Sequence, residues 1–130
     1  MAERCLVKIS EDVLQKKMQT AERAAAKIGD ERIFGLISIW VYGSTTTGVR
    51  DPEDRFSDVD IRLITDGKVN EARVLDCAQQ ALMKGEWISF LPWFSEPGMC
   101  VHLLTSTFEQ LESERGTEII KNNGKRLWPK

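Results

Sequence analysis

The apolar residues of the chain form four short runs that predict strands. Leu36 to Tyr42, LISIWVY, is rich in β-branched and aromatic residues and stops at Gly43, which is typical of a buried strand. A second strand is predicted from alternating apolar residues up to Thr65. Trp87 to Phe94 and Met99 to Leu104 predict the third and fourth strands. A short segment containing Pro97 and Gly98 joins these two, so we expect them to pair antiparallel.

Helical spacing of apolar residues predicts helices between the strands. The first helix is expected from Glu11 to Ile28, with Ser10 as its cap and Gly29 as its stop, and we expect it to serve as scaffold. The residues of its apolar stripe are Val13, Leu14, Met18, Ala21, Ala25 and Ile28. Asn70 is expected to cap a second helix that ends before Gly85. Ser106 and Glu109 have the spacing of a capping box, and Leu127 and Trp128 are expected to pin the tail. We therefore expect one α/β (α+β) domain, 1–130, with a mixed sheet of about four strands flanked by helices.

Composition narrows the class of protein. The 130 residues are 42% hydrophobic and 29% charged, with a net charge of −2, so binding of long nucleic acid is not expected. Three scattered cysteines and one histidine exclude a zinc module and argue against a disulfide framework, which favours a reducing cytoplasm. No run approaches the length that spans a membrane, and no signal peptide is recognised.

Candidate chemistry is concentrated around the second predicted strand. Asp58 and Asp60 are two residues apart, so they should lie on the same face of that strand. Two neighbouring carboxylates repel unless a cation lies between them, which suggests a Mg²⁺ or Mn²⁺ site. The turn at Gly43 and Ser44, together with Thr45, offers amides and hydroxyls to phosphate oxygens. The pattern indicates phosphate chemistry.

This arrangement resembles the DNA polymerase β-like nucleotidyltransferase superfamily, and within it the minimal nucleotidyltransferases. The similarity is carried by an apolar strand, Gly43-Ser44, Gly48, a polar loop and Ser57-Asp58-Val59-Asp60-Ile61. It implies metal-dependent transfer of a nucleoside monophosphate from a nucleoside triphosphate such as ATP to a hydroxyl group. Carried over residue by residue, Gly43 and Ser44 would bind phosphate, and Asp58 and Asp60 would bind the metal.

The chain departs from the family pattern in two places. The family has a third carboxylate on a later strand, where this chain has His102 in MCVHLLT. Either His102 replaces the third carboxylate as metal ligand and base, or Glu86 or Glu96 replaces it, or the site does not turn over. An equal alternative for His102 is a structural role, in which its imidazole hydrogen-bonds to the backbone of a neighbouring strand. The turn also lacks the arginine that the family often has two residues after the serine. Arg50 is a candidate substrate contact, with a solvated loop as the alternative.

Three functions fit these residues. The first is a nucleotidyltransferase that transfers AMP to a protein or small-molecule hydroxyl. Because the domain is small, we expect a homodimer or a helical partner to complete its site. The resemblance implies that such a helical partner forms a toxin-antitoxin pair with this chain. The second is a degenerate binding or regulatory module that resembles a nucleotidyltransferase, such as the antitoxin-type partner of a helical protein. The third is an unrelated α/β protein in which both aspartates are simply solvated. Trp87 and Trp93 could stack a base, with core packing as the alternative.

Overall fold

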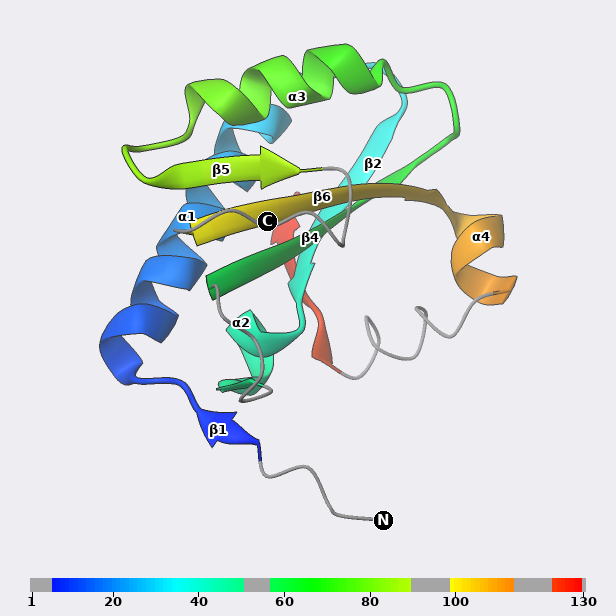
Figure 1. The fold of residues 1–130 in the computed structure, drawn as a ribbon. Coiled ribbons are helices and arrows are strands. Elements are labelled where there is room, and N and C mark those ends of the chain that lie inside the picture. The colour runs from blue at the N-terminus through cyan, green and yellow to red at the C-terminus, as the bar shows by residue number, and fades with distance from the viewer. Residues whose placement is uncertain (1–5, 51–56, 90–98, 114–122, 130) are drawn as a thin grey trace.

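A five-stranded mixed sheet in the order β5-β6-β4-β2-β7 forms the centre of the computed structural model (Figure 1). The structure describes residues 6–50, 57–89, 99–113 and 123–129; within these ranges it does not describe the side chains of residues 57, 58, 89, 99 and 111–113. The strands are β2 (Leu36–Tyr42), β4 (Ser57–Thr65), β5 (Glu86–Ser89), β6 (Met99–Thr107) and β7 (Lys125–Trp128). A separate two-stranded ribbon pairs β1 (Val7–Lys8) with β3 (Val49–Arg50).

The fold class is as predicted, a mixed sheet with helices against it, but the sheet has five strands instead of about four because the tail adds β7. β4 pairs parallel with β6 and antiparallel with β2, and β2 pairs antiparallel with β7. The predicted antiparallel pairing of the third and fourth runs is wrong, because β5 and β6 are parallel, with Glu86 opposite Met99 and Ser89 opposite His102. Parallel neighbours need a crossover rather than a hairpin. The intervening residues 90–98, including Trp93 and Glu96, lie outside the described part of the chain.

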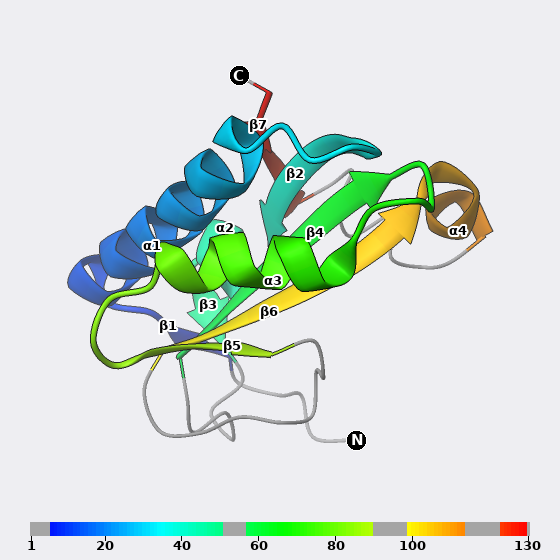
Figure 2. The ribbon, with the colours of Figure 1, turned by 90° about the horizontal axis from the view of Figure 1, so that it is seen from above.

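Helices α1 (Glu11–Asp30) and α3 (Glu71–Gln80) pack against each other and against one face of the sheet (Figures 1 and 2). The buried core lies between these two helices and the sheet. It includes Ala21, Ile28, Val41, Val59, Ile61, Leu63, Val74, Val101 and Leu103. Because strand side chains alternate, the residues between these core positions, such as Asp60 and His102, belong to the other face of the sheet.

The ends of α1 show one confirmed prediction and one error. Ser10 caps the helix, its Oγ accepting from the Val13 amide at 3.4 Å. Gly29 is not the stop, since α1 continues to Asp30 and ends at Glu31 in a right-handed conformation. Gly29 instead makes room for the tail: a Cβ there would lie 2.3 Å from Cδ1 of Trp128. The tail is pinned as expected, with Leu127 buried and Trp128 packed on the core.

The other helix starts use polar caps. Asn70 caps α3 by accepting from the Arg73 amide at 3.2 Å, as predicted. The capping box of α4 (Phe108–Ser113) is one residue later than expected: Thr107 Oγ1 accepts from the Gln110 amide, and Gln110 Oε1 accepts from the Thr107 amide. Among the described residues no helix has both the length and the apolar character to cross a membrane.

Candidate functional site

The turn after β2 brings Gly43 into direct contact with Asp60. Gly43 has φ 73° and ψ −144°, a backbone conformation that L side chains rarely adopt. A Cβ on Gly43 would lie 2.7 Å from Oδ2 of Asp60, so the carboxylate occupies the space that any other residue would fill. The two halves of the predicted site, the Gly-Ser turn and the acidic strand, therefore meet at this glycine.

The hydroxyls of the turn differ in what they can offer a ligand. Helix α2 (Ser44–Thr47) is a single turn closed by Gly48 in the left-handed conformation. Thr46 Oγ1 donates to the Gly43 carbonyl at 3.0 Å, so this hydroxyl is occupied locally. Thr45 is 2% exposed, and its Oγ1 has no hydrogen-bond partner among the described residues. Ser44 Oγ accepts a bond from Lys17 at 2.6 Å, which joins the turn to α1.

His102 lies beside Asp60 on the neighbouring strand. In the parallel pairing of β4 with β6, Asp60 is directly opposite His102, and Val59 and Ile61 are opposite the core residues Val101 and Leu103. Adjacent strands are about 4.8 Å apart, so the two side chains start as immediate neighbours on the same face. His102 is buried, at 4% exposed. The register thus places His102 beside Asp60 on the same face of the sheet.

The backbone of Asp58 belongs to the same strand, opposite Cys100, while its side chain lies outside the described part. Among the described side chains, no group of three His, Cys, Asp or Glu could hold a metal ion. Asp60 offers carboxylate oxygens, which Mg²⁺ and Mn²⁺ prefer, and His102 on the adjacent strand offers an imidazole nitrogen. The chemistry of these donors fits a divalent cation.

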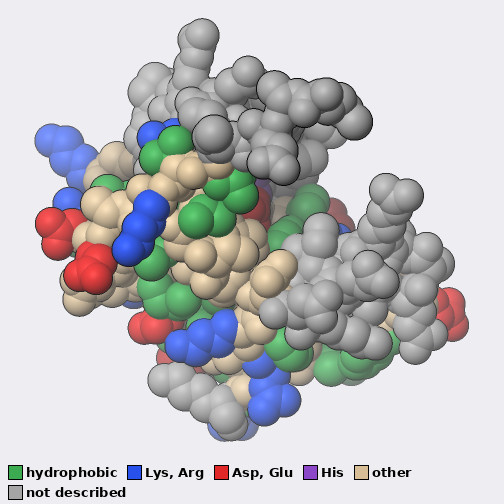
Figure 3. Space-filling model, turned by 90° about the horizontal axis from the view of Figure 1, so that it is seen from below, with side chains coloured by type: hydrophobic (Ala, Val, Ile, Leu, Met, Phe, Trp, Pro, Cys, Tyr) green, Lys and Arg blue, Asp and Glu red, His purple; other side chains and the backbone are tan. Residues whose placement is uncertain are grey.

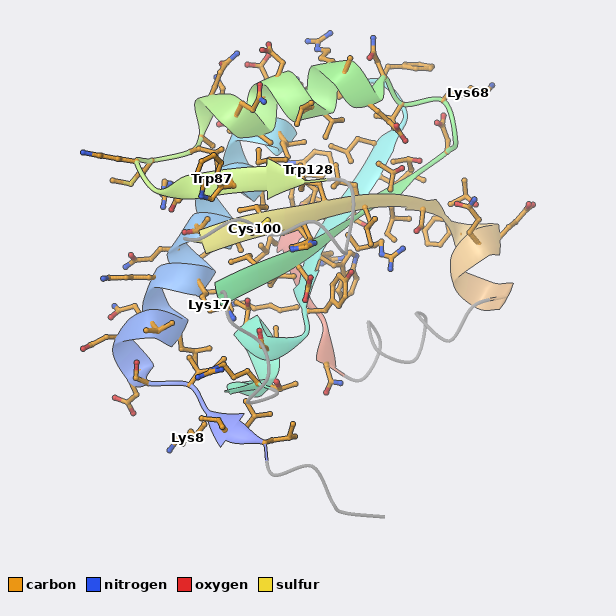
Figure 4. All side chains as sticks on the ribbon, viewed as in Figure 1. Lys8, Lys17, Lys68, Trp87, Cys100 and Trp128 are labelled. Atoms are coloured by element: carbon orange, nitrogen blue, oxygen red, sulfur yellow. The ribbon has the colours of Figure 1, made fainter. Side chains whose placement is uncertain are left out.

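Lys17 is a residue of this site that the sequence analysis did not identify. Its side chain is 2% exposed, and Nζ donates to Ser44 Oγ at 2.6 Å. Figure 4 shows Lys17 between α1 and the beginning of β4. A signal was present in the sequence, because Lys17 is four residues after Val13 and four before Ala21, within the apolar stripe of α1. A lysine in such a stripe is buried only where it has a polar partner.

Glu86 does not stand in for the third carboxylate, which removes one of the alternatives. Arg23 binds it in a two-pronged ion pair, with both N–O distances 2.9 Å, and Thr20 Oγ1 and the Met83 amide also donate to it. Burial raises the pKa of Glu86, but the hydrogen bonds from Arg23, Met83 and Thr20 outweigh burial and lower the pKa to about 2. Glu86 thus anchors the start of β5 to α1.

Next to Asp60, an aromatic and basic cluster extends along the same face. Tyr42 is opposite Asp60 in the β2–β4 pairing, and Arg62 lies 5.7 Å from the centre of the Tyr42 ring. Arg62 Nη1 also donates to Ser106 Oγ at 2.7 Å. Burial, aided by Asp60, raises the pKa of the Tyr42 hydroxyl, with Arg62 opposing. The cluster fixes the strands on both sides of Asp60.

Two further candidates from the sequence occupy different surroundings. Arg50 pairs with Val7 in the β1–β3 ribbon, so its backbone belongs to a short strand rather than a loop. Its role as a substrate contact stays a prediction. Trp87 is 43% exposed and therefore is not a core residue, contrary to the packing alternative. It shares a row of the sheet with Cys100 and Asp58, so base stacking also stays a prediction.

Two clefts of the described surface lie away from Asp60. The larger, of about 660 Å³, runs between α1 and β7, and the smaller, of about 250 Å³, lies where β4 and β6 end. On the face seen in Figure 3, both acidic and basic side chains of the described residues are visible.

No protein-family model and no curated protein matches this chain. Two solved structures are similar to it. One is a crystal structure of a toxin-antitoxin with AMP-PNP, at 22% identity over 84% of this chain and 73% of that one, with a TM-score of 0.45. The other is a candidate nucleotidyltransferase from Sulfolobus solfataricus, at 12% identity over 90% and 84% of the two chains, also with a TM-score of 0.45. Likenesses of this degree do not transfer a function to this chain.

Proposed function

We propose that the chain is a metal-dependent nucleotidyltransferase that moves a nucleoside monophosphate, in the first instance AMP, from a nucleoside triphosphate to a hydroxyl of a protein or small molecule. The observation that carries this proposal is the contact between the two motifs: Asp60 Oδ2 occupies the space above Gly43, where a Cβ would lie only 2.7 Å away. A phosphate at the turn would therefore also be next to the carboxylate.

Each residue has a defined part in this reaction. Gly43 and Ser44 hold phosphate oxygens through backbone amides and the Ser44 O–H, with Thr45 contributing its amide and Arg50 a positive charge. Asp58 and Asp60 hold Mg²⁺ or Mn²⁺, which when bound neutralises charge on the phosphates. The acceptor oxygen bonds to the α-phosphorus as the bond to the pyrophosphate oxygen breaks. His102, beside Asp60, receives the proton that the acceptor loses.

A second function is favoured by one specific observation, namely the fate of the third acid. Glu86 is held by Arg23, and none of the described side chains of β5 and β6 other than Glu86 is a carboxylate. A module that binds nucleotide without turnover, such as the antitoxin-type partner of a helical protein, has the turn and Asp60 but needs no base. This alternative differs from the first only in whether His102 works as the base.

Calorimetric titration tests whether the site binds nucleotide at all. Wild-type protein is titrated with ATP and the other triphosphates in the presence of Mg²⁺ or Mn²⁺, alongside Asp58→Asn, Asp60→Asn and the exposed control Asp76→Asn. We expect metal-dependent binding that either site variant weakens by about 100-fold or more and that the control leaves unchanged, because a lost metal ligand removes both a donor and a charge. Equal binding by all four proteins would refute the assignment.

Turnover separates the two functions once binding is shown. We expect the wild type to release pyrophosphate in the presence of an acceptor, and His102→Ala to lose most of that release while still binding triphosphate. Binding without any release, with every acceptor and partner tried, favours the module. A partner or second copy is proposed because so small a domain offers little surface to hold an acceptor. Gel filtration and co-expression with the neighbouring gene test for a homodimer or a helical partner of toxin-antitoxin type.

A further inference from the structure

The turn that carries the proposed phosphate site contains no cation of its own. From Gly43 to Val49 the sequence is GSTTTGV, and the next residue, Arg50, is paired with Val7 in the β1–β3 ribbon. Thr46, two residues after Ser44, has its hydroxyl bonded to the Gly43 carbonyl. A triphosphate carries several negative charges, so a cation at the turn itself would add to the charge that Arg50 and the proposed metal supply.

The structure brings a cation to this turn from a distant part of the chain. Lys17 lies 27 residues before Ser44, on α1, and its Nζ donates to Ser44 Oγ at 2.6 Å. The neighbouring turn of α1 carries the buried residues Thr20 and Ala21, so Lys17 lies on the side of the helix that faces the sheet. Leu14 packs near the other end of the turn, 3.7 Å from where a Cβ on Gly48 would be. Helix α1 therefore holds both ends of the turn, with the ammonium at the Ser44 end.

Burial of this ammonium needs a reason. At 2% exposed, Lys17 has given up nearly all of its hydration, which is costly for a charged group unless negative charge is close by. The hydrogen bond to Ser44 Oγ, at 2.6 Å, places the ammonium beside the proposed phosphate turn. Lys16, the preceding residue, is exposed, so the helix buries one lysine of the pair selectively.

We propose that Lys17 is a phosphate-binding residue that supplies the positive charge which the turn lacks. Ser44 orients Nζ through their hydrogen bond, and the two together contact oxygens of the triphosphate chain. The proposal rests on the proposed function, because it assigns a further ligand contact to the same site. In this proposal, helix α1 contributes a binding residue to the site in addition to its structural role. The competing role for Lys17 is a structural counter-ion that stabilises the acidic strand and touches no ligand.

Binding of ligands with different numbers of phosphates distinguishes these roles. Wild type, Lys17→Met and the exposed control Lys16→Met are titrated by calorimetry with ATP, inorganic tripolyphosphate and AMP, each with Mg²⁺. A charged hydrogen bond predicts that Lys17→Met weakens ATP and tripolyphosphate binding by roughly 10- to 100-fold and AMP binding much less. Lys16→Met should match the wild type. Equal affinities of wild type and Lys17→Met, or an equal loss for all three ligands, would overturn the proposal.

A second measurement on the wild type covers the case in which Lys17→Met does not fold. Lysine labelled with ¹³C at the ε-carbon is followed by NMR during titration with tripolyphosphate, and the Lys17 signal is assigned as the one absent from Lys17→Arg. We expect this signal to move with the binding curve while that of Lys16 stays in place. A Lys17 signal that does not move when ligand binds overturns this inference alone. Failure of the wild type to bind any triphosphate overturns it together with the proposed function.

Discussion

Replacement of Gly43 by alanine tests the contact on which the site depends. The substitution has two separable effects. The first is backbone strain, since φ is 73°, and an alanine there costs about 1–3 kcal/mol of unfolding free energy. The second is the collision of the new Cβ with Asp60 Oδ2 at 2.7 Å, whereas ordinary contacts begin at 3.4 Å. The carboxylate can swing away, so we expect it to move by at least about 0.7 Å at little further cost in stability.

Gly85 is a control for alanine at a positive φ without a collision. Its φ is 86°, and a Cβ there would meet nothing within 4 Å, so Gly85→Ala carries the backbone cost without a collision. We expect both variants to lose a similar 1–3 kcal/mol or so in urea unfolding. Only Gly43→Ala should lose affinity for ATP with Mn²⁺, by about 10- to 100-fold, because displacement of a ligand group by close to 1 Å is that costly.

The comparison can fail in two ways that refute the reasoning. If Gly43→Ala binds ATP as tightly as Gly85→Ala, the carboxylate above the turn does not contribute to the site. If Gly43→Ala is several kcal/mol less stable than Gly85→Ala, the collision is absorbed by the fold and not by rotation of Asp60. Calorimetry at matched metal concentration and urea titrations followed by circular dichroism provide both numbers for each variant.

Two further predictions concern the framework around the site. The folded pKa of Glu86, about 2, is below its ordinary 4.5, so its ion pair with Arg23 stabilises the protein above about pH 4.5 and this is lost toward pH 2. Glu86→Gln should therefore lower the free energy of unfolding by about 1–2 kcal/mol at pH 7, a value reduced because solvent reaches Arg23, and leave it unchanged near pH 2. Urea unfolding at both pH values measures this, and a loss that does not depend on pH would contradict it. Gly29→Ala should lower the free energy of unfolding by about 1–3 kcal/mol, because Trp128 occupies the space that the new Cβ needs, although glycine to alanine normally stabilises a helix. Calorimetric melting of this variant, with and without Trp128→Leu, shows whether Trp128 is the cause.

Local patterns in the sequence were sufficient for most of the elements. LISIWVY forms β2 over Leu36–Tyr42, with the boundaries as predicted, because an apolar run stopped by glycine has few other solutions. Ser10 and Asn70 cap their helices as predicted, since the hydroxyl and amide bonds are made within three residues. The capping box shifted from Ser106 to Thr107 because Ser106 belongs to β6 and accepts from Arg62, a contact across the sheet.

Pairing and direction of strands were not decided locally. β5 and β6 read as a hairpin from their separation along the chain, yet they lie parallel. Leu127 and Trp128 are predicted to pin the C-terminal tail, and the tail also forms β7 at the edge of the sheet beside β2. Both outcomes depend on which strand edges are open when the rest of the fold has formed, and a pattern within one segment contains no information on that.

The sequence by itself predicted the chemistry that the site can offer: a glycine turn and two acids on the same face of a strand, with the third-acid position of His102 implied only by the family resemblance. Spacing along a single strand or turn was enough, because side-chain direction there follows from backbone geometry. Only the tertiary structure decided that Asp60 lies against Gly43, that His102 is opposite Asp60, that Glu86 is held by Arg23, and that Lys17 reaches Ser44. Pairing of β2, β4 and β6 brings Gly43, Asp60 and His102 together. Packing of α1 on the sheet brings Lys17 to Ser44 and Arg23 to Glu86.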